Sequence, residues 1–292
     1  MAIRALLLFI LFTGSLKAQY NYIPVFPQLN GEDLLKALVE EYKTQNVLTL
    51  SQSRDTLYSK IFLYKDSVSC IYTGLSRYLD SNEDPSQYLF GNGTGSDINL
   101  EHGYPRSKGA EFAPAASDMH ALFPSRVDVN STRGSKPFGE IPDQETEIWF
   151  ALDQSMNDIP LNGIDNYSES TSTHFEPREQ VKGDIARAMF YFYTIYRDEA
   201  NMADMTFFES MMPVLCQWHT EDPVDSLEWE RTFKIATYQD DIPNPFVLDC
   251  NLYRLYCSNF FSECTVVSTD EIEITDLEIF PTLLSQGESI TI

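Results

Sequence analysis

The sequence predicts an α+β fold, in which a small strand–strand–helix unit is embedded in a mostly helical domain with long loops. Two observations predict this class. Apolar residues recur at helical spacing in the first and last parts of the chain, and a polar, turn-rich stretch over 80–97 leads into a run of functional side chains over 99–133. With 43% hydrophobic and 13% aromatic residues, the chain can bury a sizeable core, and its composition is not that of a disordered protein.

The first third of the chain is predicted to contain two helices and a strand. Asn30 precedes a series of apolar residues at helical spacing that ends near Tyr42, which indicates a capped amphipathic helix. A second helix is expected from about 51 to 62, and the stretch 67–72 is typical of a strand. The segment 80–97 is rich in Asn, Asp, Ser, Pro and Gly, so we expect a loop there.

The central segment is predicted to form the strand–strand–helix unit. A strand is expected first, followed by a variable loop over 107–116 and a second strand near 119–122. The helix is expected to start at Pro124, because proline suits the first turn of a helix. This helix would carry Asn130 back towards the first strand.

The last part of the chain is predicted to be helical. A hairpin and loop are expected over 154–172, followed by helices at 181–198, 207–218 and 224–238. The apolar stripe of the first of these predicts the longest core helix, whose aromatic residues belong to the core and do not stack on nucleic-acid bases. Prolines at 243–245 are expected to end the ordered domain.

The N-terminus is typical of a signal peptide over 1–18. Arg4 gives a positive start, an apolar stretch follows, and Ala18 offers a small residue for cleavage before Gln19. The apolar stretch is too short to span a membrane, and no second apolar segment of about twenty residues follows it. We therefore expect an exported chain without a membrane span.

Residues 19–264 are expected to form a single domain, followed by a separate segment over 265–292. That segment is acidic at first, and its end is similar to the opening of a Bacteroidetes-type C-terminal secretion-sorting β-domain, cut short. This similarity implies contact with an outer-membrane secretion machinery. The alternative is a linker and an isolated strand.

Five cysteines lie in this exported chain, where disulfides can persist. An odd number leaves one thiol over, so at most two intrachain bridges form, and the pairing cannot be deduced from spacing. Their positions are Cys70, Cys216, Cys250, Cys257 and Cys264. A zinc site built from the last three is a minor alternative, since their spacing is unlike that of common fingers.

The chemistry concentrates at Glu101, His102 and Asn130. Adjacent residues of a strand point to opposite faces, but at a strand end or bulge Glu101 and His102 could flank one metal-bound phosphate. Asn130 offers a neutral oxygen of the kind that magnesium or calcium prefers. Such a metal would stabilise charge on the phosphate while His102 deprotonates a water. No HExxH or paired CxxC pattern indicates a zinc site.

Five ordered blocks carry a resemblance to a known family. They are NLEHGYPRS at 99–107, SDMHALFP at 117–124, VNSTRG at 129–134, KPFGEI at 136–141 and FEPREQVKGDIARAMFYF at 175–192. The chain resembles the endonuclease I family, secreted or periplasmic nucleases of the His-Me finger (ββα-metal) class. Weaker similarity extends to 51–62, 71–78 and 218–247, so the resemblance covers most of the mature chain.

The resemblance implies a role for each matching residue. His102 matches the family's general base, Glu101 one metal ligand, and Asn130 the second metal ligand. The implied ion is Mg²⁺, with Ca²⁺ or Mn²⁺ as alternatives, and the implied products carry 5′-phosphates. The phosphate-binding arginine is left open among Arg106, Arg126 and Arg133, of which Arg133 lies in the best-matched block.

Several residues near the motif keep alternative interpretations. His120 and Asp118 are interpreted as supporting the site, and the family often has His-His where this chain has His120-Ala121. Another departure is Ser135, where the family often has Asn. Asn130 could instead be a turn residue or a glycosylation acceptor, because Asn130-Ser131-Thr132 fits that sequon.

The net charge of −24 at pH 7 opposes nucleic-acid binding unless charge is distributed unevenly. Basic residues do gather around the motif, at Arg106, Lys108, Arg126, Arg133 and Lys136. We therefore expect a basic groove on an acidic body, with activity that is less sensitive to salt than that of a basic nuclease.

The expected function is that of a secreted, divalent-metal-dependent endonuclease that acts as a monomer on DNA, and also on RNA, with low sequence specificity. The alternative is an exported nucleic-acid or surface-binding module that retains the same scaffold without turnover.

Overall fold

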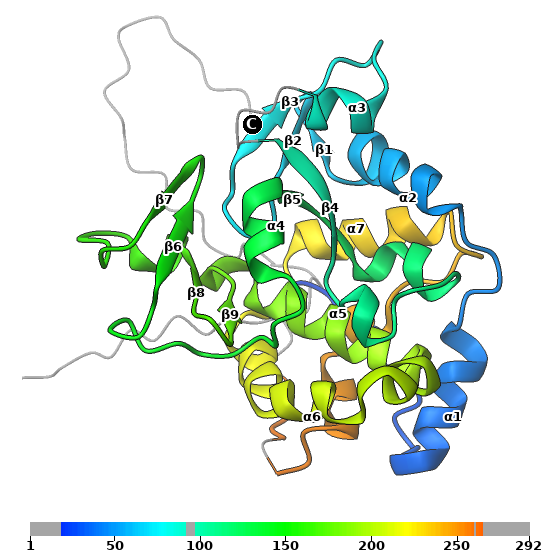
Figure 1. Ribbon diagram of the computed structural model, residues 1–292. Coiled ribbons are helices and arrows are strands. Elements are labelled where there is room, and N and C mark those ends of the chain that lie inside the picture. Colours follow the sequence, from blue (N-terminus) through cyan, green and yellow to red (C-terminus); the bar gives the residue numbers. More distant parts are fainter. Residues whose placement is uncertain (1–18, 92–96, 260, 265–292) are drawn as a thin grey trace, which may run out of the picture.

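The structure is a computed structural model that describes residues 19–91, 97–259 and 261–264 of the 292-residue chain (Figure 1). The predicted signal peptide over 1–18 and the predicted C-terminal segment over 265–292 lie outside the described residues. Within the described ranges, no helix is both long enough and apolar enough to cross a membrane.

The core is built around α5 (Lys182–Ile195), in which every residue except Asp184 is buried. In Figure 1, α5 runs through the middle of the molecule beneath the motif. The helices that pack on it are α1 (Gly31–Tyr42), α6 (Arg197–Glu221) and α8 (Pro245–Leu248). The prediction that the aromatics of α5 are core residues is confirmed, but α6 is the longer helix, with a kink at Asp204.

The predicted early and late helices are confirmed, with local differences. The helix α1 begins directly after Asn30, and α2 (Leu50–Thr56) continues as a π-helical turn over Leu57–Ile61. The helix α7 (Ser226–Ala236) lies within the predicted range. The prediction of a loop over 80–97 is wrong at α3 (Pro85–Phe90), whose first turn is capped by the side chain of Asp84.

Three small antiparallel sheets complete the fold and confirm the mixed α+β class. The first sheet consists of β1 (Leu63–Tyr64), β2 (Ser67–Ser69) and β3 (Ser76–Tyr78). The second sheet consists of β4 (Ile98–His102) and β5 (Leu122–Arg126). The third sheet has the strand order β7-β6-β8-β9 and consists of β6 (Ile148–Ala151), β7 (Gln154–Met156), β8 (Ser168–Ser170) and β9 (Phe175–Glu176). Short 3₁₀ turns lie at Arg106–Lys108, Ala115–Ser117, Met119–Ala121, Ile164–Asn166, Glu179–Val181 and Cys250–Leu255. The strand predicted over 67–72 is therefore shorter than expected.

The motif folds as two antiparallel strands, β4 and β5, followed directly by α4 (Val127–Arg133). The predicted second strand at 119–122 is wrong for most of its length, because Met119–Ala121 forms a 3₁₀ turn. The predicted helix start at Pro124 is also wrong, since Pro124 lies inside β5 opposite Leu100. Its carbonyl accepts from Ile71 N at 2.9 Å, on the side away from β4. The nitrogen of Pro124 points the same way, so the β4–β5 ladder needs no N–H there.

The ordered chain continues past the prolines at 243–245, so the expectation that these prolines end the ordered part of the chain is wrong. The helix α8 and the turn Cys250–Leu255 follow, and two disulfides, Cys216–Cys257 and Cys250–Cys264, attach this segment to α6 and close it on itself. These bridges exclude the zinc alternative for the three C-terminal cysteines. Cys70 is a buried free thiol.

Candidate active site

The strand β4 ends at His102, so Glu101 and His102 occupy a strand end, which is one of the two settings, with a bulge, that the sequence left open. Glu101 pairs with Phe123 and His102 with Leu122 across the ladder. Glu101 points inward and is only 2% exposed, whereas His102 is partly exposed. The alternation of a strand thus separates a buried carboxylate from a more accessible imidazole.

The helix α4 lies along β4 and brings Asn130 and Arg133 to it (Figure 1). These residues are three apart and share one face of the helix. Asn130 Nδ2 donates to Leu100 O at 3.0 Å and to Asn99 Oδ1 at 2.8 Å. Leu100 offers its carbonyl to Asn130 because the Leu100–Pro124 pair is not hydrogen-bonded across the ladder.

The carboxylate of Glu101 is held by two groups. The Tyr72 hydroxyl donates to Oε1 at 2.7 Å, and the guanidinium of Arg133 lies 3.3 Å from the same oxygen. Burial raises the pKa of Glu101, and the charge of Arg133 and the Tyr72 hydrogen bond oppose that rise. Sequence reasoning missed Tyr72, although it lies in the weakly similar segment 71–78.

The imidazole of His102 is fixed in one tautomer by the main chain. Its Nε2 lies 3.0 Å from Ala116 O. A carbonyl only accepts, so Nε2 carries the proton and Nδ1 keeps its lone pair. Ala116 is itself held in place, because Ser53 of α2 donates to Ser117 O at 2.9 Å. Burial lowers the pKa of His102 to about 4, and the nearby charges of Arg106 and Arg133 also lower it.

The three candidate arginines occupy different environments. Arg126 is buried and paired with Asp128, with nitrogen–oxygen distances of 2.6 and 2.8 Å. Arg133 is also buried, and it donates to His102 O at 3.1 Å and to Gly103 O at 2.6 Å. Arg106 is exposed at the 3₁₀ turn that follows β4. Of the three, Arg106 alone is placed to meet a ligand from solvent.

The five basic residues around the motif do not line an open basic groove. Lys108 is 2.7 Å from a carboxylate oxygen of Asp204, and Lys136 donates to Ser170 Oγ and Thr171 O. Arg126 and Arg133 are buried, so Arg106 is the exposed member of this set. The expectation of a groove built from all five is therefore wrong, because folding uses four of these side chains internally.

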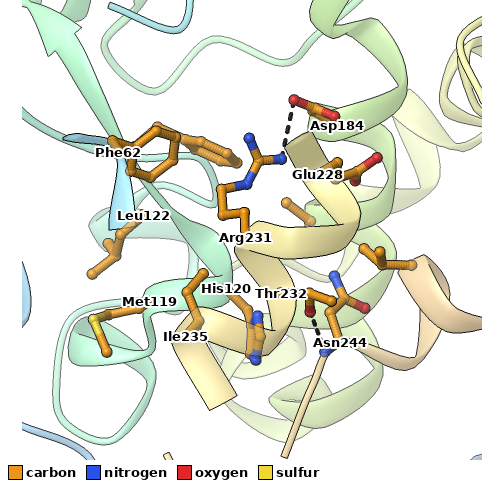
Figure 2. Close-up of a pocket in the computed structure, with 13 residues that line it drawn as sticks. Phe62, Met119, His120, Leu122, Asp184, Glu228, Arg231, Thr232, Ile235 and Asn244 are labelled. Atoms are coloured by element: carbon orange, nitrogen blue, oxygen red, sulfur yellow. Dashed lines mark hydrogen bonds and ion pairs between the residues drawn. The ribbon is translucent and has the colours of Figure 1, made fainter. Parts of the chain in front are cut away.

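Asp118 and His120 lie behind the site, in the interior. Asp118 accepts hydrogen bonds from the hydroxyls of Tyr191 and Tyr196, each at 2.7 Å. His120 Nε2 lies 3.0 Å from Ile242 O, and its ring lines a small cavity of about 20 Å³ beside residues of α7 (Figure 2). Both side chains join the turn before β5 to the helical core.

The side chains at the end of β4 and on α4 could hold an oxygen-preferring metal only if the Asn130 amide is counted together with the Glu101 carboxylate. Among the described residues, no group of three or more His, Cys, Asp or Glu side chains is arranged to hold a metal ion. The two hydrogen bonds of Asn130 use its nitrogen and so orient the amide, which leaves Oδ1 as the amide atom that could contact a metal. Glu101 and Asn130 together offer two protein oxygens.

Comparison with known proteins gives one family over most of the chain. Residues 32–250 match the family model described as Endonuclease I. An extracellular ribonuclease of Bacillus amyloliquefaciens is 30% identical over 195 residues, which are 62% of this chain and 58% of that protein. An extracellular ribonuclease of Bacillus subtilis (strain 168) is 29% identical over 187 residues, 58% of this chain and 57% of that protein.

A third relative carries a different substrate in its name. The periplasmic deoxyribonuclease of Aeromonas hydrophila is 27% identical over 140 residues, 48% of this chain and 51% of that protein. The chain thus spans between half and two thirds of the length of these curated relatives.

Proposed function

Because this chain belongs to the endonuclease I family, we propose that it is a divalent-metal-dependent endonuclease that hydrolyses phosphodiester bonds of DNA, and also of RNA, with low sequence specificity. Relatives named as ribonucleases and as a deoxyribonuclease support both substrates. Their extracellular and periplasmic locations agree with the secreted or periplasmic location predicted for this chain. We further propose that it acts as a monomer.

Glu101 and Asn130 would hold the metal ion, with Mg²⁺ as the first choice and Ca²⁺ or Mn²⁺ as alternatives. Mg²⁺ is usually bound through one or two carboxylates together with substrate phosphates, and it keeps several waters. A site with the single carboxylate of Glu101, supplemented by the Asn130 amide oxygen, is compatible with that pattern. When bound, the ion supplies charge stabilisation to the phosphate and the leaving oxygen. We also propose that β4, β5 and α4 form a ββα-metal unit.

His102 would act as the general base. Its Nδ1 lone pair would accept a proton from the attacking water, while the Nε2–H group continues to donate its hydrogen bond to Ala116 O. With a pKa of about 4, the imidazole is neutral at neutral pH and Nδ1 is free to take that proton. The tautomer set by Ala116 is the single observation that carries the proposal.

Arg106 would bind the scissile phosphate, because it is the exposed one of the three candidate arginines. Arg133 would act indirectly: it sets the position of Glu101 and of the main chain at His102 and Gly103. This division gives different roles to two of the three arginines among which the sequence left the phosphate-binding residue open.

Digestion of a plasmid by the exported protein tests the proposal. We expect cleavage with Mg²⁺, no cleavage with a chelator, and a loss of about 10²- to 10⁴-fold in His102→Ala with an unchanged unfolding temperature. His174→Ala, which removes an exposed histidine outside the site, is the matched control. Near-normal cleavage by His102→Ala would refute the role of His102 as general base. Binding of DNA without cleavage by the wild type would favour the alternative, an inactive binding module.

A further inference from the structure

We propose that Tyr72 is a positioning residue for Glu101: its hydroxyl holds one carboxylate oxygen so that the other faces the metal ion. The proposal rests on the proposed function of this site. Tyr72 lies 29 residues before Glu101, in the turn after β2, and is fully buried. Its hydroxyl donates to Glu101 Oε1 at 2.7 Å.

Two hydrogen bonds to its main chain attach the turn that carries Tyr72 to its neighbours. Ile71 N donates to Pro124 O of β5 at 2.9 Å, and Ser168 Oγ of β8 donates to Tyr72 O at 2.7 Å. The ring of Tyr72 packs edge-on against Phe175, with 4.8 Å between the ring centroids. The phenol therefore has a fixed position relative to β5, and through β5 relative to β4.

The Leu100–Pro124 pair explains how the two strands β4 and β5 position both Tyr72 and the amide of Asn130. Because this pair is not hydrogen-bonded across the ladder, its two carbonyls point outward in opposite directions. Pro124 O receives Ile71 N, which places Tyr72, and Leu100 O receives Asn130 Nδ2, which places the amide. The two proposed metal ligands are thus set by the same register.

Arg133 does not replace Tyr72 in this role. Its hydrogen bonds go to the carbonyls of His102, Gly103 and Gly134, and its approach to Glu101 is an ion pair at 3.3 Å. Within the part of the chain that the structure describes, Tyr72 is the one group that hydrogen-bonds the Glu101 carboxylate. Both contacts fall on Oε1, which leaves Oε2 for a metal.

Tyr72→Phe removes the hydroxyl and keeps the ring. Loss of a group that orients a metal ligand typically weakens metal affinity about 10- to 100-fold. We expect the Mg²⁺ concentration that gives half of the thermal stabilisation to rise by about tenfold or more. The Mg²⁺ concentration for half-maximal cleavage should rise in parallel, with the rate recovering at saturating Mg²⁺.

Tyr58→Phe is the matched control. Tyr58 is also fully buried, and its hydroxyl has no hydrogen-bond partner in the described structure. Both exchanges remove one buried hydroxyl, but Tyr58 lies on the π-helical turn and does not touch Glu101. Tyr58→Phe should therefore titrate with Mg²⁺ as the wild type does.

The measurements separate the two levels of the proposal. If the wild type shows no Mg²⁺-dependent rise in unfolding temperature and Glu101→Gln behaves identically, the metal site itself is refuted. If the wild type responds, Glu101→Gln does not, and Tyr72→Phe titrates like the wild type, the positioning role is overturned while the nuclease proposal stands. Equal weakening in Tyr58→Phe and Tyr72→Phe would also overturn it.

Discussion

Glu101 and Asp118 are two buried carboxylates of one motif, and they differ in how their oxygens are used. The structure gives Asp118 two hydrogen bonds on each oxygen, from the main-chain N–H of His120 and the side chains of Gln239, Tyr191 and Tyr196. Glu101 receives one hydrogen bond, from Tyr72, on Oε1. Both carboxylate oxygens of Asp118 thus accept hydrogen bonds, whereas only one oxygen of Glu101 does.

The difference assigns the two carboxylates to different tasks. A buried polar group with all its partners in place stabilises a unique packing, whereas one that lacks partners costs stability unless a ligand supplies them. Asp118 joins the turn before β5 to α5 and to the segment after α7. Glu101 keeps an oxygen for something that folding does not provide, which agrees with a metal ligand.

The strongest test of this contrast is Glu101→Gln. We expect cleavage to fall about 100- to 1000-fold, because the exchange removes the charge of the proposed metal ligand. The metal-free unfolding temperature at pH 7 should not fall. Burial raises the pKa of Glu101, so this group stabilises the folded state only at low pH, and that stabilisation is lost as pH rises through the raised pKa.

Initial rates of plasmid cleavage and thermal unfolding in chelator measure both effects. Glu111→Gln, an exposed glutamate in the loop after β4, makes the same chemical change outside the site. A Glu101→Gln protein that cleaves normally, or that unfolds several degrees earlier without metal, would show that Glu101 is a structural residue like Asp118.

Asp118→Asn should give the opposite result. The amide places an NH₂ group against donors, so we expect a loss of about 3 kcal/mol in the free energy of unfolding, measured by urea titration. Cleavage per folded molecule should stay near the wild-type value. Asp240→Asn is the control, because Asp240 accepts from Thr44, Gln45 and Asn46 at the surface, where water can replace lost bonds. A larger loss in Asp240→Asn would contradict the argument from burial.

His219 and His102 are two histidines whose Nε2 atoms face main-chain carbonyls, and His219 shows how burial affects protonation away from the motif. Its Nε2 lies 2.8 Å from Cys250 O, as His102 Nε2 lies against Ala116 O, but His219 is buried away from the motif. Burial lowers the pKa of His219 from 6.5 to about 3. The unfolded chain therefore binds a proton more readily, so this group's contribution to stability is complete above pH 6.5 and is lost as pH falls towards 3.

The variant His219→Phe should therefore lose less stability than the wild type between pH 6.5 and pH 4. It lacks the hydrogen bond to Cys250, so it starts lower at neutral pH, and the gap narrows as His219 of the unfolded wild-type chain protonates. Thermal unfolding over this pH range measures the gap, with His174→Phe at an exposed histidine as the control. A gap that stays constant would refute the assigned pKa shift.

Sequence patterns predicted the parts of this fold that depend on neighbouring residues. The apolar spacing after Asn30 and along α5 placed both helices, because a buried helix face repeats every few residues. The ordered motif blocks placed Glu101 and His102 on a strand and Asn130 on the following helix. Their roles in catalysis stay predictions.

Other features depend on contacts that are distant in the sequence. Local sequence predicts a helix start at Pro124, because only the register with Leu100 and the contact to Ile71 make a proline acceptable inside β5. Tyr72 was missed because its partner lies 29 residues away. The basic residues were grouped by sequence position, which cannot reveal that Lys108 pairs with Asp204 on α6.

Arg106→Ala has the smallest expected effect and tests how the acidic chain meets its substrate. With the other basic residues near the motif engaged internally, Arg106 is the guanidinium left for phosphate, so we expect kcat/KM to fall about tenfold, equivalent to about 1.4 kcal/mol. The slope of log activity against log salt should become shallower by about one. Arg197→Ala on α6 changes the net charge equally, and its side chain pairs with Glu32 away from the motif. If both variants lose activity and salt dependence equally, overall charge governs the encounter, and the single exposed arginine does not.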